Sequence, residues 1–254
     1  MFCRILLTTA AAVAFGGTAL AADLPTTKGP PVYTPPPPIF TWSGVYIGGQ
    51  VGYAWGRAWT ESTYFFPAPI GTQSYALPPV GPSGVIGGAH VGYNYQTGSF
   101  VFGVEGDVNG SSYNGSAIKT NAFLGTFSLG TREPIDASIR GRAGYAWNRA
   151  LLYATGGVAL GGLDNFNTLG DSAHTTAVGW TVGGGVEYAI DNNWSARVEY
   201  RYTDFGRDYF TAPGAAIFGF IPNVSSRQIE NRVQAGFSYK FDMFIPPTPI
   251  VSKY

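Results

Sequence analysis

Hydrophobic and polar residues alternate with a period of two along much of the chain after Trp42. In residues 230–241 the apolar positions are Val233, Ala235, Phe237, Tyr239 and Phe241. The positions between them are mostly polar or charged, namely Glu230, Arg232, Gln234, Ser238 and Lys240. Because successive side chains of a β-strand point to opposite faces, this pattern predicts a strand with one apolar and one charged face.

Seven earlier segments repeat the alternation, at residues 45–55, 85–95, 100–108, 135–147, 151–163, 178–188 and 194–203. Each is about ten residues or slightly longer, which is the length that a tilted strand needs to cross a bilayer. Residues 151–163 are nearly all apolar or glycine, so the pattern leaves open which of their side chains share a face. We therefore expect an all-β chain of eight antiparallel strands.

The connections between these segments alternate between short and long. Residues 96–99, 148–149 and 191–193 form predicted tight turns, whereas 58–83, 110–133, 164–175 and 206–227 form predicted long loops. Short periplasmic turns and long external loops are typical of outer-membrane β-barrels, and an even strand count returns both ends of the barrel to the periplasm.

A soluble β-sandwich also alternates and is the alternative. It should carry many Lys and Glu on its polar faces, whereas here those faces carry Gly, Thr and charges of both signs.

Composition narrows the class further. Only 12% of residues are charged, about half the share of a soluble domain, and the chain has 36 glycines. After residue 22 no stretch approaches the ~20 apolar residues that a spanning helix requires, so a closed barrel is the remaining way to satisfy the backbone in lipid. The formal net charge of +0 argues against a nucleic-acid partner.

The first 22 residues resemble a secretory signal peptide. Arg4 precedes an apolar run, and small residues permit cleavage after Ala21 or Ala22, although a short membrane anchor is an alternative. Cys3, the single cysteine, lies before the cut. We expect a proline-rich periplasmic tether at 23–40, the barrel at 41–241 and a periplasmic tail at 242–254, because proline disfavours sheet pairing.

If the apolar faces meet lipid, the charged faces line the interior. The expected interior network comprises Glu105, Asp107, Arg140, Arg142, Glu187, Arg197, Glu199, Arg201, Glu230, Arg232 and Lys240. Eight strands enclose a space that side chains alone can fill, so the favoured interpretation is a salt-bridged core that does not conduct. The alternative is a narrow pore whose ion preference is set by Arg140, Arg142, Arg197 and Arg201.

Aromatic residues gather near segment ends, where membrane interfaces favour them. The expected girdle comprises Trp42, Trp55, Tyr93, Tyr95, Trp147, Trp194 and Tyr202. In the first long loop, one group of rings is a candidate surface for an external partner: Trp59, Tyr64, Phe65, Phe66 and Tyr75. These rings could equally pack on their own rim.

Little in the sequence supports catalysis. The histidines are His90, expected inside near the periplasmic half, and His174, expected in an outer loop beside Asp171 and Ser172. A lipid-modifying barrel enzyme would need a nucleophile and base, and such a polar loop cluster is usually only solvated. We expect no enzyme activity, no cofactor and no metal site.

Four motifs together resemble one family, the small outer-membrane immunogenic proteins of alphaproteobacteria, which belong with the OmpA-like and opacity-type barrels. These are TWSGVYIGGQVGY (41–53), IRGRAGYA (139–146), ARVEYRY (196–202) and NRVQAGFSYKF (231–241). The resemblance covers nearly all of the chain after the signal peptide. It implies an abundant, surface-exposed and often antigenic envelope protein, sometimes described as a porin, with no catalytic residues.

The expected partners are outer-membrane lipid and lipopolysaccharide, the outer-membrane insertion machinery and an external surface partner. Family members usually end at the aromatic residue that the insertion machinery recognises, which here is Phe241. The chain continues to Tyr254, so the resemblance leaves open which of these two residues is read.

Overall fold

The computed structural model describes residues 40–241 except 122–124, 168–171, 212–215 and 217–218. The predicted signal peptide, nearly all of the tether, and the tail lie outside the described residues. The described part of the chain forms nine strands: β1 (Gly44–Phe65), β2 (Thr72–Val80), β3 (Ser83–Thr97), β4 (Phe100–Asn121), β5 (Gly125–Trp147), β6 (Ala150–Asn167), β7 (Ser172–Ala189), β8 (Trp194–Thr211) and β9 (Asn223–Lys240). No helix in this part is long and apolar enough to cross a membrane.

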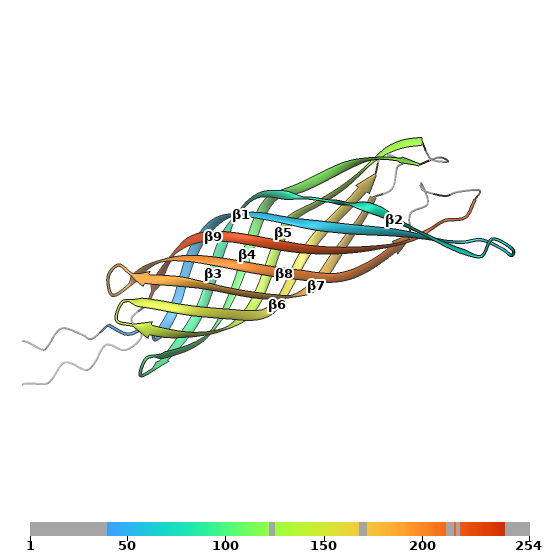
Figure 1. The fold of residues 1–254 in the computed structure, drawn as a ribbon. Coiled ribbons are helices and arrows are strands. Elements are labelled where there is room, and N and C mark those ends of the chain that lie inside the picture. Colours follow the sequence, from blue (N-terminus) through green and yellow to red (C-terminus); the bar gives the residue numbers. More distant parts are fainter. Residues whose placement is uncertain (1–39, 122–124, 168–171, 212–215, 217–218, 242–254) are drawn as a thin grey trace, which may run out of the picture. The chain divides into compact units, whose positions relative to one another are not determined.

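Eight of these strands close into an antiparallel ring in the order β1-β3-β4-β5-β6-β7-β8-β9, with β9 paired back to β1 (Figure 1). The backbone partners can be followed once round this ring, starting from Tyr46 on β1. They pass through Gly92, Glu105, Arg140, Gly157, Thr181, Thr203 and Glu230 and return to β1 at Gly56. The register has shifted by 56 − 46 = 10 residues, and such a stagger accompanies the strand tilt of closed barrels.

The ninth strand, β2, continues the line of β3 after an interruption at residues 81–82. β1 pairs with β3 from Gly44 to Trp55 and with β2 from Ala58 to Phe65, so the two strands occupy successive parts of one ring position. The predicted count of eight ring strands is confirmed, and the extra strand lengthens the wall at one place.

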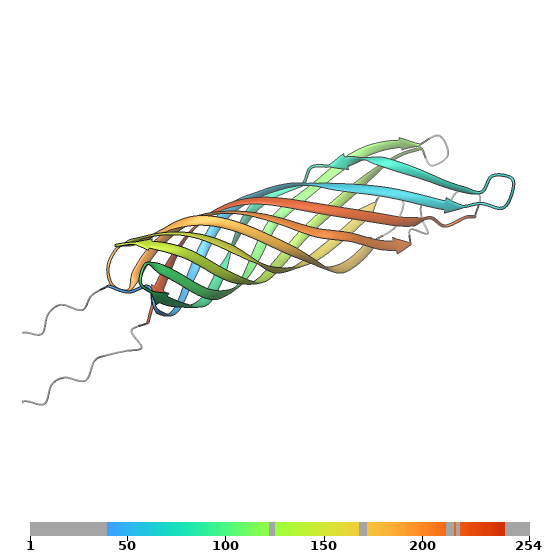
Figure 2. The same ribbon diagram turned by 60° about the horizontal axis from the view of Figure 1, so that its bottom comes forward.

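Most of the residues expected in long loops instead extend the strands. Strand pairing covers 58–65 and 72–80, and β4 and β5 pair from Asn121↔Gly125 onward. In the same way β6 and β7 reach Asn167 and Ser172, and β8 and β9 reach Thr211 and Asn223. The loop prediction was wrong here because it assumed that strands stop where the apolar face stops, whereas backbone pairing continues beyond that level. Figure 2 shows these extended hairpins at the end opposite the tight turns; we call these two ends the hairpin end and the turn end.

The two faces of the wall differ as the alternation predicts. Large apolar side chains point outward and are exposed, among them Ile47, Val91, Val104, Ile139 and Val198. The ambiguous segment 151–163 also alternates: Leu151 and Tyr153 are buried inside, while Leu152 and Leu160 face outward. An exposed apolar exterior around a polar interior is the reverse of a soluble sandwich.

A cluster of rings and small apolar residues fills the turn end of the interior. Trp42 is 4% exposed and packs with Val101, Leu151 and Tyr153, and its ring meets Phe40 edge-on at 5.1 Å between centroids. The assignment of Trp42 to the exterior aromatic girdle was therefore wrong. The residue lies just before β1, where the chain turns under the barrel, so strand alternation does not set its direction.

Candidate functional site

The interior of the barrel is the candidate functional site because it holds most of the charged side chains of the spanning wall. Ten of the eleven residues expected in the interior network are buried: Glu105, Asp107, Arg140, Arg142, Glu187, Arg197, Glu199, Arg201, Glu230 and Arg232. Lys240 is half-buried at the turn end. Its ammonium group contacts the carbonyl of Thr41 and lies 4.8 Å from the centroid of the Phe40 ring. It belongs to the closure of that end and not to the central network.

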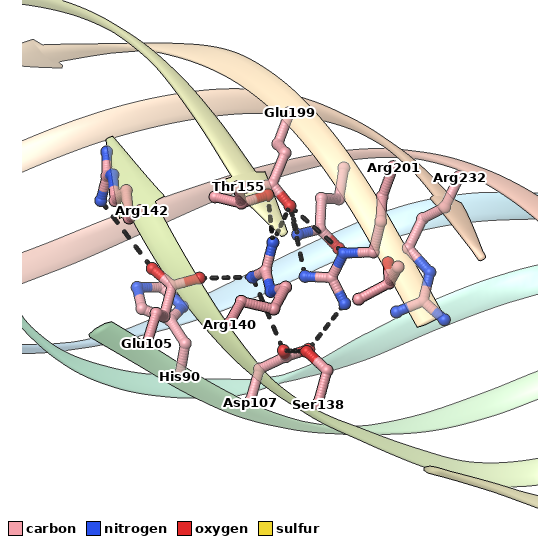
Figure 3. A network of polar contacts seen from close by, with 12 residues as sticks. His90, Glu105, Asp107, Ser138, Arg140, Arg142, Thr155, Glu199, Arg201 and Arg232 are labelled. Atoms are coloured by element: carbon pink, nitrogen blue, oxygen red, sulfur yellow. Dashed lines mark hydrogen bonds and ion pairs between the residues drawn. The ribbon is translucent and has the colours of Figure 1, made fainter. Parts of the chain in front are cut away.

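Glu105 on β4 joins several interior side chains, and Figure 3 shows its contacts with Arg140 and Arg142. Its Oε1 lies 2.5 Å from Arg140 Nη2, and its Oε2 lies 2.5 Å from Arg197 Nη1. The hydroxyl of Tyr46 donates a third hydrogen bond to Oε2 at 2.8 Å. Because β4 and β8 are four places apart in a ring of eight, the bond to Arg197 crosses the full width of the barrel.

Two further acids, Asp107 on β4 and Glu199 on β8, lie in the next layer toward the hairpin end. Asp107 Oδ2 lies 3.0 Å from Arg201 Nη1, which is a second bridge from β4 to β8. Glu199 Oε1 lies 2.7 Å from Arg140 Nη1 and 3.2 Å from Arg201 Nη2. Arg140 Nη2 also lies 3.6 Å from Asp107 Oδ1, so the fully buried Arg140 joins both acids to Glu105.

Arg142 and Glu187 form the layer nearest the turn end. They make a short ion pair, and the hydroxyl of Ser195 donates to the other oxygen of Glu187 at 2.5 Å. The guanidinium of Arg142 also lies 3.8 Å from the centroid of the Tyr153 ring, which is cation–π geometry. This layer rests on the Trp42 cluster, which contains Tyr153.

Arg232 joins two acids near the hairpin end. Its Nη2 lies 2.6 Å from Glu230 and its Nη1 3.0 Å from Asp136. Glu133, also buried here, was missed by the sequence analysis; its Oε2 accepts a hydrogen bond from Gln228 at 3.0 Å. Strict alternation from Ile135 places Glu133 outside, but register shifts on both sides of Pro134 insert an extra residue and turn Glu133 inward. A proline within a strand was the available signal for such a bulge.

Neutral polar groups complete the interior. His90 lies inside, as expected, between Gln50 Oε1 at 2.5 Å and Ser238 Oγ at 2.9 Å. Gln50 also accepts a hydrogen bond from Arg197 at 3.1 Å and donates one to Asn109 at 2.6 Å. Both ring nitrogens of His90 are thus engaged in hydrogen bonds that hold neighbouring side chains together.

The physical effect of this arrangement is to fill and lock the interior. A buried ion pair contributes little net free energy relative to an apolar pair, but removing one partner leaves an uncompensated charge and costs about 3–5 kcal/mol. Each central arginine has at least two carboxylate or amide partners, so the side chains are held in one arrangement.

Six of the predicted girdle residues face the exterior: Trp55, Tyr93, Tyr95, Trp147, Trp194 and Tyr202. Tyr95, Trp147 and Trp194 lie beside the tight turns, and Trp55 and Tyr202 lie toward the hairpin end, where Tyr202 is tilted against Trp180 at 5.5 Å. Rings therefore border the apolar exterior on both sides.

The rings expected in the first loop lie instead on or beside the β1–β2 hairpin. Trp59, Phe65 and Tyr75 are exposed, whereas Tyr64 is buried. Tyr64 stacks on Phe66 at 5.8 Å and meets Tyr75 edge-on at 5.9 Å. The structure thus divides these rings between a packed rim and an exposed surface.

His174 lies in β7, paired with Asp164, and not in a loop; its side chain and Asp171 lie outside the described residues. Among the described residues, no group of three or more His, Cys, Asp or Glu side chains is arranged to hold a metal ion.

The matching family model and two related proteins agree with this architecture. The family model described as "Outer membrane protein beta-barrel domain" matches residues 8–241. The 31 kDa outer-membrane immunogenic protein of Brucella melitensis is 35% identical over 93% of this chain and 99% of its own length. A 22 kDa outer membrane protein of Rhizobium leguminosarum is 32% identical over 82% of each chain. The solved structure of OprG from Pseudomonas aeruginosa has a TM-score of 0.49 at 14% identity, and the match covers 78% of this chain and 96% of that chain.

The matched region includes every strand of the ring, and the apolar exterior is the surface that lipid requires of a closed barrel. The chain belongs to the outer-membrane β-barrel family that includes these immunogenic proteins, and its location is the outer membrane.

Proposed function

We propose that the chain is a non-conducting, non-catalytic barrel of the cell envelope that displays a rigid hairpin outside the cell. The observation that carries the first half of this proposal is the pair of bridges across the barrel, Glu105 to Arg197 and Asp107 to Arg201. An ion would have to separate charges that are bonded to each other across the full width of the interior. The narrow pore remains the competing function.

Conductance of the refolded protein in planar bilayers tests this proposal. The wild type should give no discrete conductance steps. The double variant Glu105→Ala/Arg197→Ala, which removes one bridge, should give steps or a higher leak. Ile139→Ala is the matched control, because that side chain is 73% exposed on the lipid face and does not enter the interior.

Discrete wild-type conductance that shifts when Arg140 or Arg197 is neutralised would overturn the proposal and support the pore.

The second half of the proposal concerns the β1–β2 hairpin. Short turns of outer-membrane barrels face the periplasm, so the hairpin end projects outside the cell. The buried Tyr64 ring holds Phe66 and Tyr75 in place, and Phe66 in turn packs edge-on against Phe220 at 5.1 Å. Pre-ordering of this kind lowers the entropic cost of binding an external partner.

If this hairpin binds an external partner, cells that carry the double variant Phe65→Ser/Tyr75→Ser should lose adherence to host or abiotic surfaces. The variant barrel should keep its heat-modifiable migration on gels. Unchanged adherence with an intact barrel would contradict a contact role for this hairpin.

Phe241 supports a proposal about assembly. Its amide donates to Val45 O at 2.9 Å and its ring packs edge-on with Tyr239, so it ends the paired part of the barrel. We propose that the insertion machinery reads Phe241 at this internal position and not Tyr254, which lies outside the described residues. Phe241→Ala should then lower the amount of barrel in outer-membrane fractions more than Tyr254→Ala does, and the opposite order would contradict it.

A further inference from the structure

Three arginines lie close together on the outer surface of the wall at the hairpin end. Arg57, Arg207 and Arg227 come from β1, β8 and β9, which are neighbours in the ring, and all three are exposed. Arg227 pairs with Trp59 on one side and with Arg207 on the other, and directly paired residues share a face. Trp59 lies an even number of residues from Tyr53 and Trp55 on the same strand, and both of these face the exterior. Trp59 and the arginines that share its face therefore also point outward.

Arg207 reaches this face only because β8 is irregular. Alternation from Tyr202 places the even-numbered residues of β8 outside, but the register shifts between Asp204 and Arg207. Phe205 lies in the interior, as alternation places it, and packs against Ala159, Leu163 and Ala177, whereas the bulge brings Arg207 to the outside.

The arginines lie just beyond the lipid-facing band. On β1 the outward residues run Ile47, Val51, Tyr53 and Trp55, and Arg57 follows as the next outward position. Arg57 pairs with Ile229, and Arg227 is the next outward residue of β9. Aromatic residues mark the level of the membrane interface, so the arginines lie at the level of the outer-leaflet headgroups.

The surface around these arginines contains a cavity that is lined by aromatic, polar and charged side chains. A cavity of about 350 Å³ is lined by Trp59, Glu61, Ser225, Arg207 and Arg227, among others. Asp204 lies 2.6 Å from Arg227 Nη2 and fixes that arginine while leaving it half-exposed. Among the described residues, neither Arg57 nor Arg207 has a carboxylate within ion-pair distance. With Asp204 and Glu61 counted, the three arginines leave a net charge of 3 − 2 = +1.

We propose that this surface, formed by Arg57, Arg207, Arg227 and Trp59, binds the phosphorylated amino-sugar headgroup of the lipopolysaccharide in the outer leaflet. Guanidinium groups match phosphate oxygens in pairs of hydrogen bonds. Trp59 offers a flat apolar ring on which a sugar can stack. The occupant is the lipid and not a free sugar phosphate, because the surface begins where the acyl-chain band ends and so meets a headgroup already held at that depth.

Binding of lipid A by the refolded full-length protein in detergent micelles tests this site, with native mass spectrometry as the readout. The probes are bis-phosphorylated lipid A and the same lipid with both phosphates removed. Arg57→Gln/Arg207→Gln should weaken binding of the phosphorylated lipid by at least about tenfold, because each charge-assisted hydrogen bond contributes roughly one decade of affinity. Arg227 is kept, since it also holds Asp204.

Arg132→Gln is the matched control. Arg132 is an exposed arginine of β5, directly paired with Asp164, on the wall opposite β9. This variant should bind phosphorylated lipid A as the wild type does. Trp59→Ala, which changes no charge, should weaken binding of both lipids.

Three results would overturn the proposal: equal affinity of the wild type for the two lipids, an equal loss in Arg132→Gln, or no loss in Arg57→Gln/Arg207→Gln. Displacement of lipid A by millimolar inorganic phosphate would show a general anion site and would also overturn it. Folding of each variant is checked by heat-modifiable gel migration. None of these outcomes depends on whether the barrel conducts.

Discussion

Arg197 Nη1 lies 2.5 Å from Glu105 Oε2, although the two residues are 92 positions apart and project from opposite walls of the barrel. Glu105 simultaneously holds Arg140 through its other oxygen. One carboxylate thus connects β4, β5 and β8. Removing one of these three side chains should therefore destabilise the barrel, because it leaves a buried charge without its partner.

A double-mutant cycle measures that connection. Glu105→Gln should lower the free energy of unfolding by about 3–5 kcal/mol, because it leaves Arg140 and Arg197 buried with too little compensating charge. Arg197→Met should cost less, since Glu105 keeps Arg140. Together the two substitutions should cost clearly less than their sum, as measured by urea unfolding in phospholipid vesicles. Additive costs would contradict direct coupling.

Adjacent glycines on β1 provide a test of how full the interior is. A Cβ at Gly48 would lie 2.1 Å from the carbonyl oxygen of Phe237 and 2.4 Å from His90 Nε2, whereas at Gly49 the nearest atom would be 3.6 Å away. Gly48→Ala should therefore destabilise the barrel by about 1–3 kcal/mol through overpacking. Gly49→Ala, which adds the same methyl group to the outer face, should have little effect in the same unfolding assay. Equal effects would show that the interior has room.

The Trp42 cluster predicts a cavity effect at the turn end. Trp42→Ala should lower the free energy of unfolding by about 3 kcal/mol, because the ring fills space among Val101, Leu151 and Tyr153. Trp147→Ala is the control, since that ring is 76% exposed at the end of β5 and its loss leaves no internal void. A larger loss in the control would contradict the internal position of Trp42.

Asp191 predicts a pH effect outside the spanning strands. The backbone amides of Trp194 and Asn193 donate to its Oδ1 at 2.7 and 2.8 Å, and these bonds hold the pKa of the Asp191 carboxyl below its usual range. The carboxylate therefore stabilises the turn above the pKa of an unfolded aspartate. That contribution is lost as the pH falls through the lowered pKa of the folded state. An NMR titration of the Asp191 carboxyl carbon in micelles should give a midpoint below about 3.9, the usual value; a midpoint at or above it would contradict the hydrogen-bonded turn.

Alternation alone identified the eight ring strands, their antiparallel order and most of the charges that the structure places inside. Because each strand has a period of two and one face must meet lipid, a polar residue at every second position has only the interior to occupy. That reasoning was sufficient for Arg140, Arg197 and Glu199, whose strands are regular at those positions.

The tertiary structure decided the orientation and pairing of residues that alternation cannot predict. Bulges at Pro134 and between Asp204 and Arg207 reverse the faces of Glu133 and Arg207, and an inserted residue is not visible in a period of two. Trp42 precedes the first strand, so packing alone placed it inside. The pairing of Glu105 with Arg197 follows from the ten-residue stagger that closes the ring. The amino-acid sequence therefore determined which residues face inward where the strands are regular. Ring closure decided which of these residues meet, because stagger is a property of all eight strands together.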